Sequence, residues 1–297
     1  MFPNTLYAIP FVLAALPALA ADVTIDTYRG EMTVAENPET IAVFDMAALD
    51  TLEALGVETQ ATIENVYLAY LEDAAAGTVR VGSLFEPDYE ALNALQPDLI
   101  IAGGRSYDAV PDLAKMAPTI DMTIWEDTIG QALDRLEAFG QIFDKTNEAE
   151  ALRAEFDAKL AQVRAAADSQ GKTMIVMTNG PKVSAYGAAG RFGWLHTAFG
   201  LQEAVADVEE VTHGEAISFE FIRDANPDLL LVIDRSAAIG KPGSAKATLD
   251  NALVREVPAW KNGKVVYLPS AEIYIAGGGI QSLNGTMDAL LAAFGGS

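Results

Sequence analysis

Cysteine is absent from all 297 residues of the chain. The chain can therefore form no disulfide, no zinc–thiolate site and no thiol nucleophile, and it carries no cysteine for a lipid anchor. Basic residues are scarce, because 19 Lys and Arg stand against 42 Asp and Glu, for a net charge of −23. A field of that sign repels nucleic acid and anionic lipid, so we expect no nucleic-acid partner. An anionic ligand would need a local basic cluster.

Histidine is nearly absent as well. His196 lies in the apolar, helix-like stretch FGWLHTAFG, which favours a packing role. His213 lies in the polar loop VTHGEAIS, where a neutral imidazole could ligate a metal. A free zinc ion needs about four protein ligands, so one available histidine disfavours a site for an uncomplexed metal.

Only one long hydrophobic run occurs, between Leu6 and Leu19, and the sequence Ala-Leu-Ala precedes Ala21. This pattern is typical of a secretory signal, so we predict that residues 1–20 are a signal peptide and that the mature chain is exported to the periplasm. Residues 1–5 contain no Lys or Arg, which leaves a retained membrane anchor as the alternative. No later run approaches the length needed to span a membrane.

A helix is predicted near the middle of the chain, over TNEAEALRAEFDAKLAQVRAAADS from Thr146 to Ser169. Apolar residues recur at spacings of three and four, and neither Gly nor Pro interrupts them. A helix of about 24 residues is roughly 36 Å long. We expect residues 146–170 to form a backbone helix that joins two lobes.

Short β-rich runs alternate with helical runs on both sides of this segment. TIAVF, DLIIA, TMIVM and DLLLVI are strand-like, and AALDTLEAL and YEALNAL between them are helix-like. This alternation is typical of parallel α/β structure. The predicted fold is therefore two α/β lobes with mainly parallel sheets, residues 21–145 and 171–297, joined by one long helix.

The two halves share a sequence register. Residues 89–101, YEALNALQPDLII, match residues 219–231, FEFIRDANPDLLL. In each half a glutamate, Glu90 or Glu220, opens a short helix that ends at a Pro-Asp turn before a buried strand. Such Pro-Asp strings also recur in unrelated α/β proteins, because a turn followed by a buried strand favours these residue types.

Three arginines follow turns or glycine-rich stretches. In each copy of the register an arginine comes seven residues after the aspartate: Arg105 in the first and Arg235 in the second. The carboxyl ends of such strands are where open α/β sheets bind ligands. Arg191, in YGAAGRFGW, is the third. Each could be an ordinary surface arginine, but three that converge on a cleft would hold an anion of high charge.

Tyr274 precedes three glycines in EIYIAGGGIQSL, and glycines would let the backbone approach a ligand. The tyrosine could simply pack there. One tyrosine and one histidine suit the completion of the coordination sphere of Fe³⁺ that a chelator already holds through hard oxygens. The arginines would then balance the negative charge of the chelate.

The chain resembles the periplasmic substrate-binding proteins of ABC importers that take up ferric siderophores. Within them it is similar to the helical-backbone class, class III, which also binds haem and cobalamin. The resemblance runs from about Thr40 to Phe294 and is strongest in VTHGEAISFEFIRDANPDLLLVIDRS, LDNALV and VYLPSAEIYIAGGGIQSL. These stretches look like the subgroup that binds catecholate siderophores.

The resemblance implies roles for particular residues. The iron-coordinating histidine and tyrosine of that subgroup fall on His213 and Tyr274, and its cleft arginines match Arg105, Arg191 and Arg235. It also implies a binding protein and not an enzyme, with a ferric siderophore as transported ligand and no intrinsic cofactor.

The partner that the resemblance implies is an inner-membrane ABC permease, which would contact Glu90 and Glu220; we expect the binding protein itself to be a monomer. A haem- or cobalamin-binding protein on the same scaffold is the main alternative. An exported hydrolase is a further one, and the sequence contains neither G-x-S-x-G nor H-E-x-x-H in its support.

Overall fold

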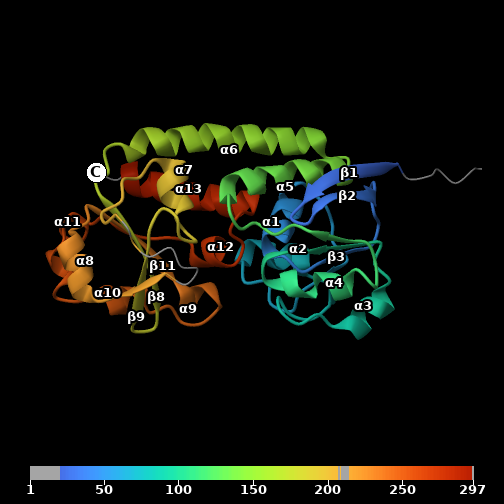
Figure 1. Ribbon diagram of the computed structural model, residues 1–297, viewed down its shortest axis with the longest axis horizontal. Helices are drawn as coiled ribbons and strands as arrows, with labels where there is room; N and C mark the ends of the chain where they lie inside the picture. The colour runs from blue at the N-terminus through green and yellow to red at the C-terminus, as the bar shows by residue number, and fades with distance from the viewer. Residues whose placement is uncertain (1–20, 207, 209–213, 296–297) are drawn as a thin grey trace, which may run out of the picture.

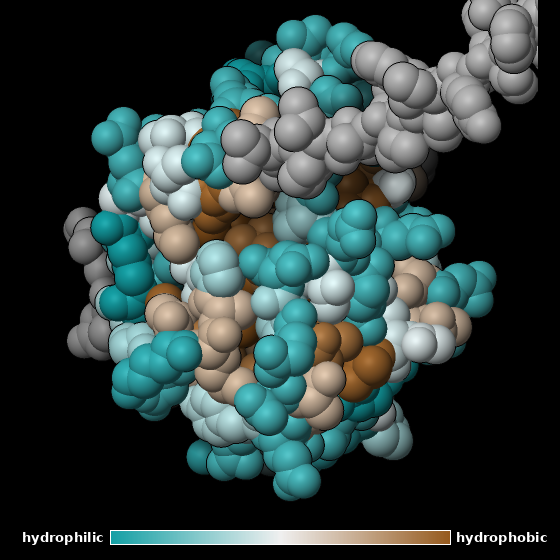
Figure 2. Space-filling view, turned by 90° about the vertical axis from the view of Figure 1, so that its right-hand side faces the viewer, coloured by the Kyte–Doolittle hydropathy of each residue, from teal (hydrophilic) through white to brown (hydrophobic). Residues whose placement is uncertain are grey.

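The computed structural model describes residues 21–206, 208 and 214–295. Two lobes lie side by side along the long axis, and helix α6 runs above both of them (Figure 1). The predicted architecture of two α/β lobes is confirmed. The predicted signal peptide, residues 1–20, lies outside the described residues. Seen from the N-terminal lobe, the surface is largely hydrophilic, with separate hydrophobic areas (Figure 2).

The N-terminal lobe contains a parallel sheet in the order β5-β4-β3-β6-β7. Its central strands are buried on both faces, which is why they read as continuous apolar runs. The strands are β3 (Ile41–Val43), β4 (Ala61–Thr62), β5 (Val79–Arg80), β6 (Leu99–Ala102) and β7 (Thr119–Asp121). An antiparallel hairpin, β1 (Asp22–Thr27) and β2 (Gly30–Ala35), precedes them. The helices of this lobe are α1 (Met46–Ala54), η1 (Ala69–Leu71), α2 (Glu72–Ala75), α3 (Tyr89–Leu95), η2 (Gly104–Ala109), α4 (Val110–Leu113) and α5 (Thr128–Ile142).

The C-terminal lobe has a second sheet, in the order β10-β9-β8-β11-β12. Its strands are β8 (Thr173–Asn179), β9 (Lys182–Tyr186), β10 (Glu215–Ile217), β11 (Leu229–Asp234) and β12 (Val265–Tyr267). Its helices are α7 (Trp194–Phe199), α8 (Phe219–Ala225), α9 (Arg235–Ala238), α10 (Ala245–Leu249), η3 (Val254–Glu256), α11 (Pro258–Lys261), α12 (Ser270–Tyr274) and α13 (Ile280–Gly295).

This second sheet is mixed. Strands β8, β11 and β12 are parallel, whereas β9 pairs antiparallel with both β8 and β10. The reason is the short connection after β8, where Gly180 adopts a φ of +59° and reverses the chain without a crossover helix. An Asn-Gly pair between two apolar runs is a sequence signal for such a hairpin.

The interlobe helix α6 spans Thr146–Ala167. One face of it is buried against α5 and α13, through residues that include Phe156, Leu160 and Val163. It begins at the predicted first residue and ends at Ala167, before the predicted end at residue 170; its N-cap is Lys145, and no side chain caps it.

A second helix, α13, lies beside α6 and also connects the lobes (Figure 1). Asp50, on α1 of the N-terminal lobe, accepts hydrogen bonds from the first-turn amides of Gln281 (2.8 Å) and Ser282 (3.0 Å). Thr51 Oγ1 accepts a third, from the amide of Ile280 at 3.2 Å. The N-terminal lobe thus holds the start of the last helix.

The internal register has a structural basis in both lobes. Asp98 Oδ2 accepts a hydrogen bond from the amide of Thr40, at the start of β3, and Asp228 Oδ2 accepts one from Lys172, at the start of β8. Each aspartate follows a helix that ends in a left-handed residue, Gln96 in one lobe and its counterpart Asn226 in the other. The Pro-Asp turn therefore joins a helix end to the neighbouring strand.

Candidate functional site

The three predicted arginines come together around Tyr274, the last residue of α12. Arg105 donates from Nη2 to the carbonyl oxygen of Tyr274 at 2.6 Å and from Nη1 to that of Ile275 at 3.1 Å. Arg191 Nη2 donates to the same Tyr274 carbonyl at 2.8 Å, and Arg235 Nε donates to the Tyr274 hydroxyl at 3.1 Å. The three residues come from both lobes, so this cluster lies where the lobes meet.

The guanidinium groups also approach the face of the Tyr274 ring. Their central carbons lie 4.5 Å (Arg191), 5.2 Å (Arg105) and 5.8 Å (Arg235) from the ring centroid. Cations within about 6 Å of an aromatic ring are attracted by its quadrupole. The ring therefore helps to hold three like charges close together.

Each arginine is placed by the element before it. Arg105 follows β6 on η2, and Arg235 follows β11 as the first residue of α9, so both lie at the carboxyl ends of their strands, as the register predicted. Arg191 lies in the loop between β9 and α7. A Cβ at Gly193 would lie 1.9 Å from the carbonyl oxygen of Ala188, so this loop requires glycine.

Among the described residues, none of the three cluster arginines forms an ion pair within 4.0 Å, although the carboxyl of Asp45 attracts Arg105 from a longer distance. Within the described part of the chain, arginines that form ion pairs within 4.0 Å are Arg29, Arg153, Arg223 and Arg255. Burial, together with the charge of Arg191, lowers the pKa of Arg105. A cluster that carries this unfavourable repulsion is suited to an anionic ligand.

The environment of Tyr274 favours its phenolate. Burial alone raises the pKa of the hydroxyl, but the hydrogen bond from Arg235 and the charges of Arg191, Arg235 and Arg105 outweigh it, so that the pKa lies below its ordinary value. A phenolate is a hard anionic oxygen ligand, which suits Fe³⁺.

The predicted histidine ligand, His213, lies outside the described residues. Gly214, which follows it, packs against Tyr186: a Cβ there would lie 2.7 Å from Tyr186 Cζ. Burial raises the pKa of Tyr186 to about 12, and the charge of Arg191 opposes this rise. The first described residue after the histidine loop is therefore close to the arginine cluster.

His196 is buried in α7, and its Nδ1 lies 3.0 Å from the carbonyl oxygen of Leu201. Burial lowers its pKa. This position agrees with the packing role that the sequence indicates. Within the described residues there is no cluster of three or more His, Asp or Glu side chains that could hold a metal ion.

The two glutamates of the register occupy equivalent positions on separate lobes. Glu90 lies in the first turn of α3 and Glu220 in the first turn of α8, and both are exposed. Hydrogen bonds from its own amide and from Ser218 lower the pKa of Glu220. Neither residue belongs to the arginine cluster.

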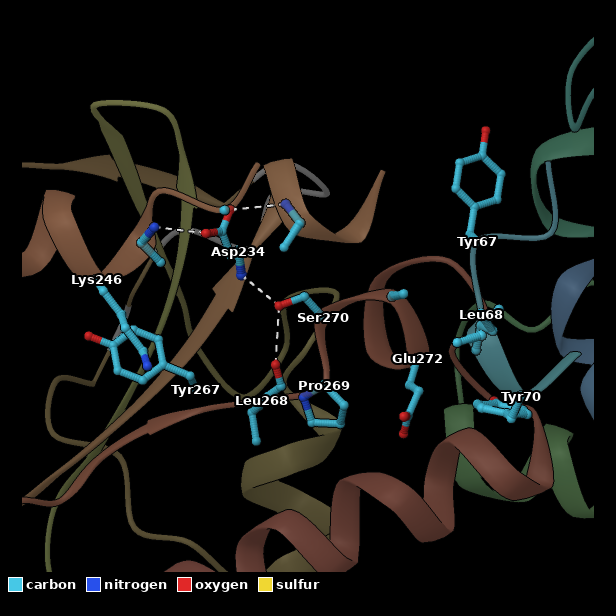
Figure 3. Close-up of a pocket in the computed structure, with 15 residues that line it drawn as sticks. Tyr67, Leu68, Tyr70, Asp234, Lys246, Tyr267, Leu268, Pro269, Ser270 and Glu272 are labelled. Atoms are coloured by element: carbon cyan, nitrogen blue, oxygen red, sulfur yellow. Dashed lines mark hydrogen bonds between the residues drawn. The ribbon is translucent and has the colours of Figure 1, made fainter. Parts of the chain in front are cut away.

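Beside the arginine cluster is a cavity of about 530 Å³ that the sequence analysis did not predict. Tyr67 and Tyr70 of the N-terminal lobe line one side, and Lys246 and Tyr267 line the other (Figure 3). Glu272, two residues before Tyr274, lies at its floor near Tyr70 (Figure 3). No arginine is among the residues that line this cavity, and Lys246 is its one basic lining residue among those the structure describes.

None of the helices in residues 21–206 and 214–295 is both long and apolar enough to cross a membrane.

Comparison with known proteins adds independent findings. A family described as periplasmic binding protein matches residues 41–272. The petrobactin-binding protein of Bacillus subtilis is 37% identical over 257 residues, which cover 84% of this chain and 80% of that protein. The ferric-anguibactin-binding protein of Vibrio anguillarum is 31% identical over 285 residues, which cover 93% and 88%. The structure of the periplasmic catecholate-siderophore-binding protein of Vibrio cholerae matches with a TM-score of 0.85 at 30% identity, and covers 92% of this chain and 100% of that one.

Proposed function

Because the chain belongs to the periplasmic binding protein family, we propose that it captures an anionic ferric siderophore, of the catecholate type, and delivers it to the permease of an ABC importer. The family and the matched relatives are solute-binding proteins, so the chain is a binding protein and not an enzyme. The ferric siderophore is its transported ligand and not a resident cofactor.

The convergence of Arg105, Arg191 and Arg235 on Tyr274 carries this proposal. A ferric catecholate bears several negative charges on oxygens around the metal. Three guanidinium groups that form no ion pair within 4.0 Å with any described carboxylate offer charge-assisted hydrogen bonds to those oxygens. The same groups lower the pKa of the Tyr274 hydroxyl, which makes it easier for this oxygen to bind iron as a phenolate where the chelate leaves a position open.

His213 is the second proposed iron ligand. A neutral imidazole and a phenolate could fill coordination positions that a tetradentate siderophore leaves free, whereas a hexadentate siderophore would need neither. The arginines would then remain the main contacts.

Proposals for location and partner complete this function. Residues 1–20 would be removed on export, and the mature chain would act in the periplasm as a monomer. The inner-membrane permease would contact Glu90 and Glu220, one exposed anion on each lobe.

A titration of intrinsic fluorescence tests the cargo. The mature protein is mixed with a tetradentate ferric catecholate, a ferric hydroxamate, ferric citrate, haem and cyanocobalamin, and the titration is repeated on His213→Ala and Tyr274→Phe. Trp125, 60% exposed on the loop after β7, is a suitable reporter. We expect submicromolar binding of the ferric catecholate, with a charge-transfer band that shifts in both variants.

The other outcomes are informative. If both variants bind the ferric catecholate as tightly as the parent protein does, recognition would rest on the arginines alone. Binding of haem or cobalamin, with no affinity for any iron chelate, would contradict the proposed cargo.

A further inference from the structure

Two aromatic side chains close to Glu90 are left in solvent. Phe85 is 66% exposed and Tyr89 is 41% exposed, and they lie four residues apart, just before and at the start of α3. Seen from the N-terminal lobe, most of the surface is hydrophilic (Figure 2). A phenyl ring that stays in solvent gains none of the free energy that its burial would provide. Exposed apolar groups surrounded by polar residues are typical of interaction surfaces.

The turn that carries Phe85 is fixed by hydrogen bonds. The amide of Ser83 donates to the carbonyl of Glu86 at 2.9 Å, and that of Asp88 donates to Val81 at 2.8 Å. The Ser83 hydroxyl accepts from the amides of Phe85 (3.2 Å) and Glu86 (3.0 Å). The ring therefore stands at the tip of an ordered turn.

Glycine is required at the base of this turn. Gly82 has a φ of +101°, and a Cβ there would lie 2.3 Å from the carbonyl oxygen of Glu86. Its own carbonyl accepts from the amide of Glu64 at 2.8 Å, which ties the turn to the segment after β4. The chain thus holds Phe85 outward by backbone geometry as well as by hydrogen bonds.

The same turn is joined to the glutamate of the proposed docking site. Asp88 caps α3, because its Oδ1 accepts from the amides of Glu90 and Ala91, both at 3.0 Å. Glu86 and Glu90, which directly follow the two aromatic residues in the sequence, are both exposed and add two negative charges to this surface. This charge fits a partner with basic side chains around an apolar pocket, and it repels an anionic lipid surface.

The C-terminal lobe differs at the equivalent place. Phe219, the counterpart of Tyr89, packs with Phe221 against the core of that lobe. Near Glu220 lies Arg223, which is paired with Asp224 at 2.7 Å. Of the described residues around the two glutamates, only those of the N-terminal lobe therefore present exposed aromatic rings.

We propose that Phe85 and Tyr89 are an apolar anchor through which the N-terminal lobe binds the permease, next to the contact made by Glu90. The proposal rests on the proposed importer function. It makes docking asymmetric: one lobe binds through charge alone, and the other through charge and a buried phenyl ring. Buried aromatic anchors dominate the energetics of protein interfaces, whereas exposed ion pairs contribute little.

Photo-crosslinking tests the anchor without any ligand. Because the natural chain lacks cysteine, Asn93→Cys on the exposed side of α3 gives a single thiol for benzophenone maleimide. Labelled protein is irradiated with inner-membrane vesicles, and the adduct is identified by mass spectrometry. We expect a permease subunit as the adduct, with a yield about 10-fold lower in Phe85→Ser and within about threefold of the parent in Phe85→Leu, which keeps the apolar contact.

An equal yield from Phe85→Ser and its parent would overturn the anchor. Affinity for ferric petrobactin is measured on the same variants, and we expect it to be unchanged, which also shows that they are folded. Failure of the parent protein to bind ferric petrobactin would contradict the proposed cargo and would leave the crosslinking result intact.

Discussion

The hydroxyl of Tyr274 receives a hydrogen bond from Arg235, and its carbonyl receives hydrogen bonds from the other two arginines of the cluster. The backbone carbonyl of Tyr274 thus positions two guanidinium groups, and its side-chain hydroxyl contacts the third. The pKa of the Tyr274 hydroxyl is consequently sensitive to the positive charge at the site.

Removal of one guanidinium should change that acidity. In Arg235→Gln the Tyr274 hydroxyl loses its charged donor, so its pKa should rise toward or above the ordinary value, because burial then acts with less opposition. An ultraviolet difference titration of phenolate absorbance measures the shift, with Tyr274→Phe to assign the transition. An unchanged titration would contradict the coupling.

Arg191 should contribute directly to affinity. A charge-assisted hydrogen bond is worth about 1.5–3 kcal/mol, so Arg191→Gln should weaken binding of a ferric catecholate by roughly 10- to 100-fold. Arg153→Gln, on α6, is the matched control, because Arg153 pairs with Asp157 away from the cluster. Equal affinities of the two variants would argue against the arginine site.

At the scale of elements, the packing of α1 and α12 against α13 brings the buried carboxyl of Asp50 close to the half-buried carboxyl of Glu272. Burial raises the pKa of Asp50 to about 6, even though Tyr70, Gln281 and Ser282 donate hydrogen bonds to it. Burial and the charge of Asp50 raise the pKa of Glu272 to about 7. Glu272 Oε2 is buried without a hydrogen-bond partner, next to Gly285 on α13.

These carboxyl groups should make stability fall as the pH rises. Each has a higher pKa in the folded protein than the ordinary value of its side chain, 3.8 for Asp50 and 4.5 for Glu272. Both therefore contribute fully at pH values below those ordinary values and lose that contribution as the pH rises from there through about 6 to 7. Glu272→Gln removes one ionisation. It should raise the free energy of unfolding at pH 8 by on the order of 1 kcal/mol, since the group is partly exposed, and should change little at pH 4.

Urea unfolding at the two pH values measures this difference. Glu31→Gln, at an exposed position of β2, is the control and should have no pH-dependent effect. A Glu272→Gln variant that is no more stable than the parent at pH 8 would show that the burial of this carboxyl costs little.

The elements differ in how far the sequence predicts them. Helix α6 and the strand-end arginines follow from local pattern, since apolar spacing and the Pro-Asp register need no knowledge of the fold. The antiparallel pairing of β9 with β8 was not predicted, although the Asn179-Gly180 turn between them is a local hairpin signal. The Asp50 network and the interlobe cavity join residues about 200 positions apart, and only packing brings them together.

At the scale of the whole molecule, the net charge is −23, so the proposed docking on a permease must depend on where particular anions are placed and not on negative charge in general. Glu90 and Glu220 lie on separate lobes, so reversal of both should remove both proposed ion contacts with the permease. Cells that carry Glu90→Lys with Glu220→Lys should lose uptake of iron from a ferric siderophore, while the purified variant binds it with unchanged affinity.

The control for this experiment changes net charge equally elsewhere. Glu150→Lys with Glu155→Lys reverses two exposed carboxylates on α6. Normal uptake is expected from that variant. If it fails to the same extent, the global charge and not the placement of the glutamates would be responsible.

The capping of α13 by Asp50 and Thr51 affects the order of events during synthesis. Leu283, Met287 and Leu290, near the very end of the chain, are buried in the same core as α1. The lobe that is made first therefore lacks part of its core until almost the entire polypeptide has left the ribosome.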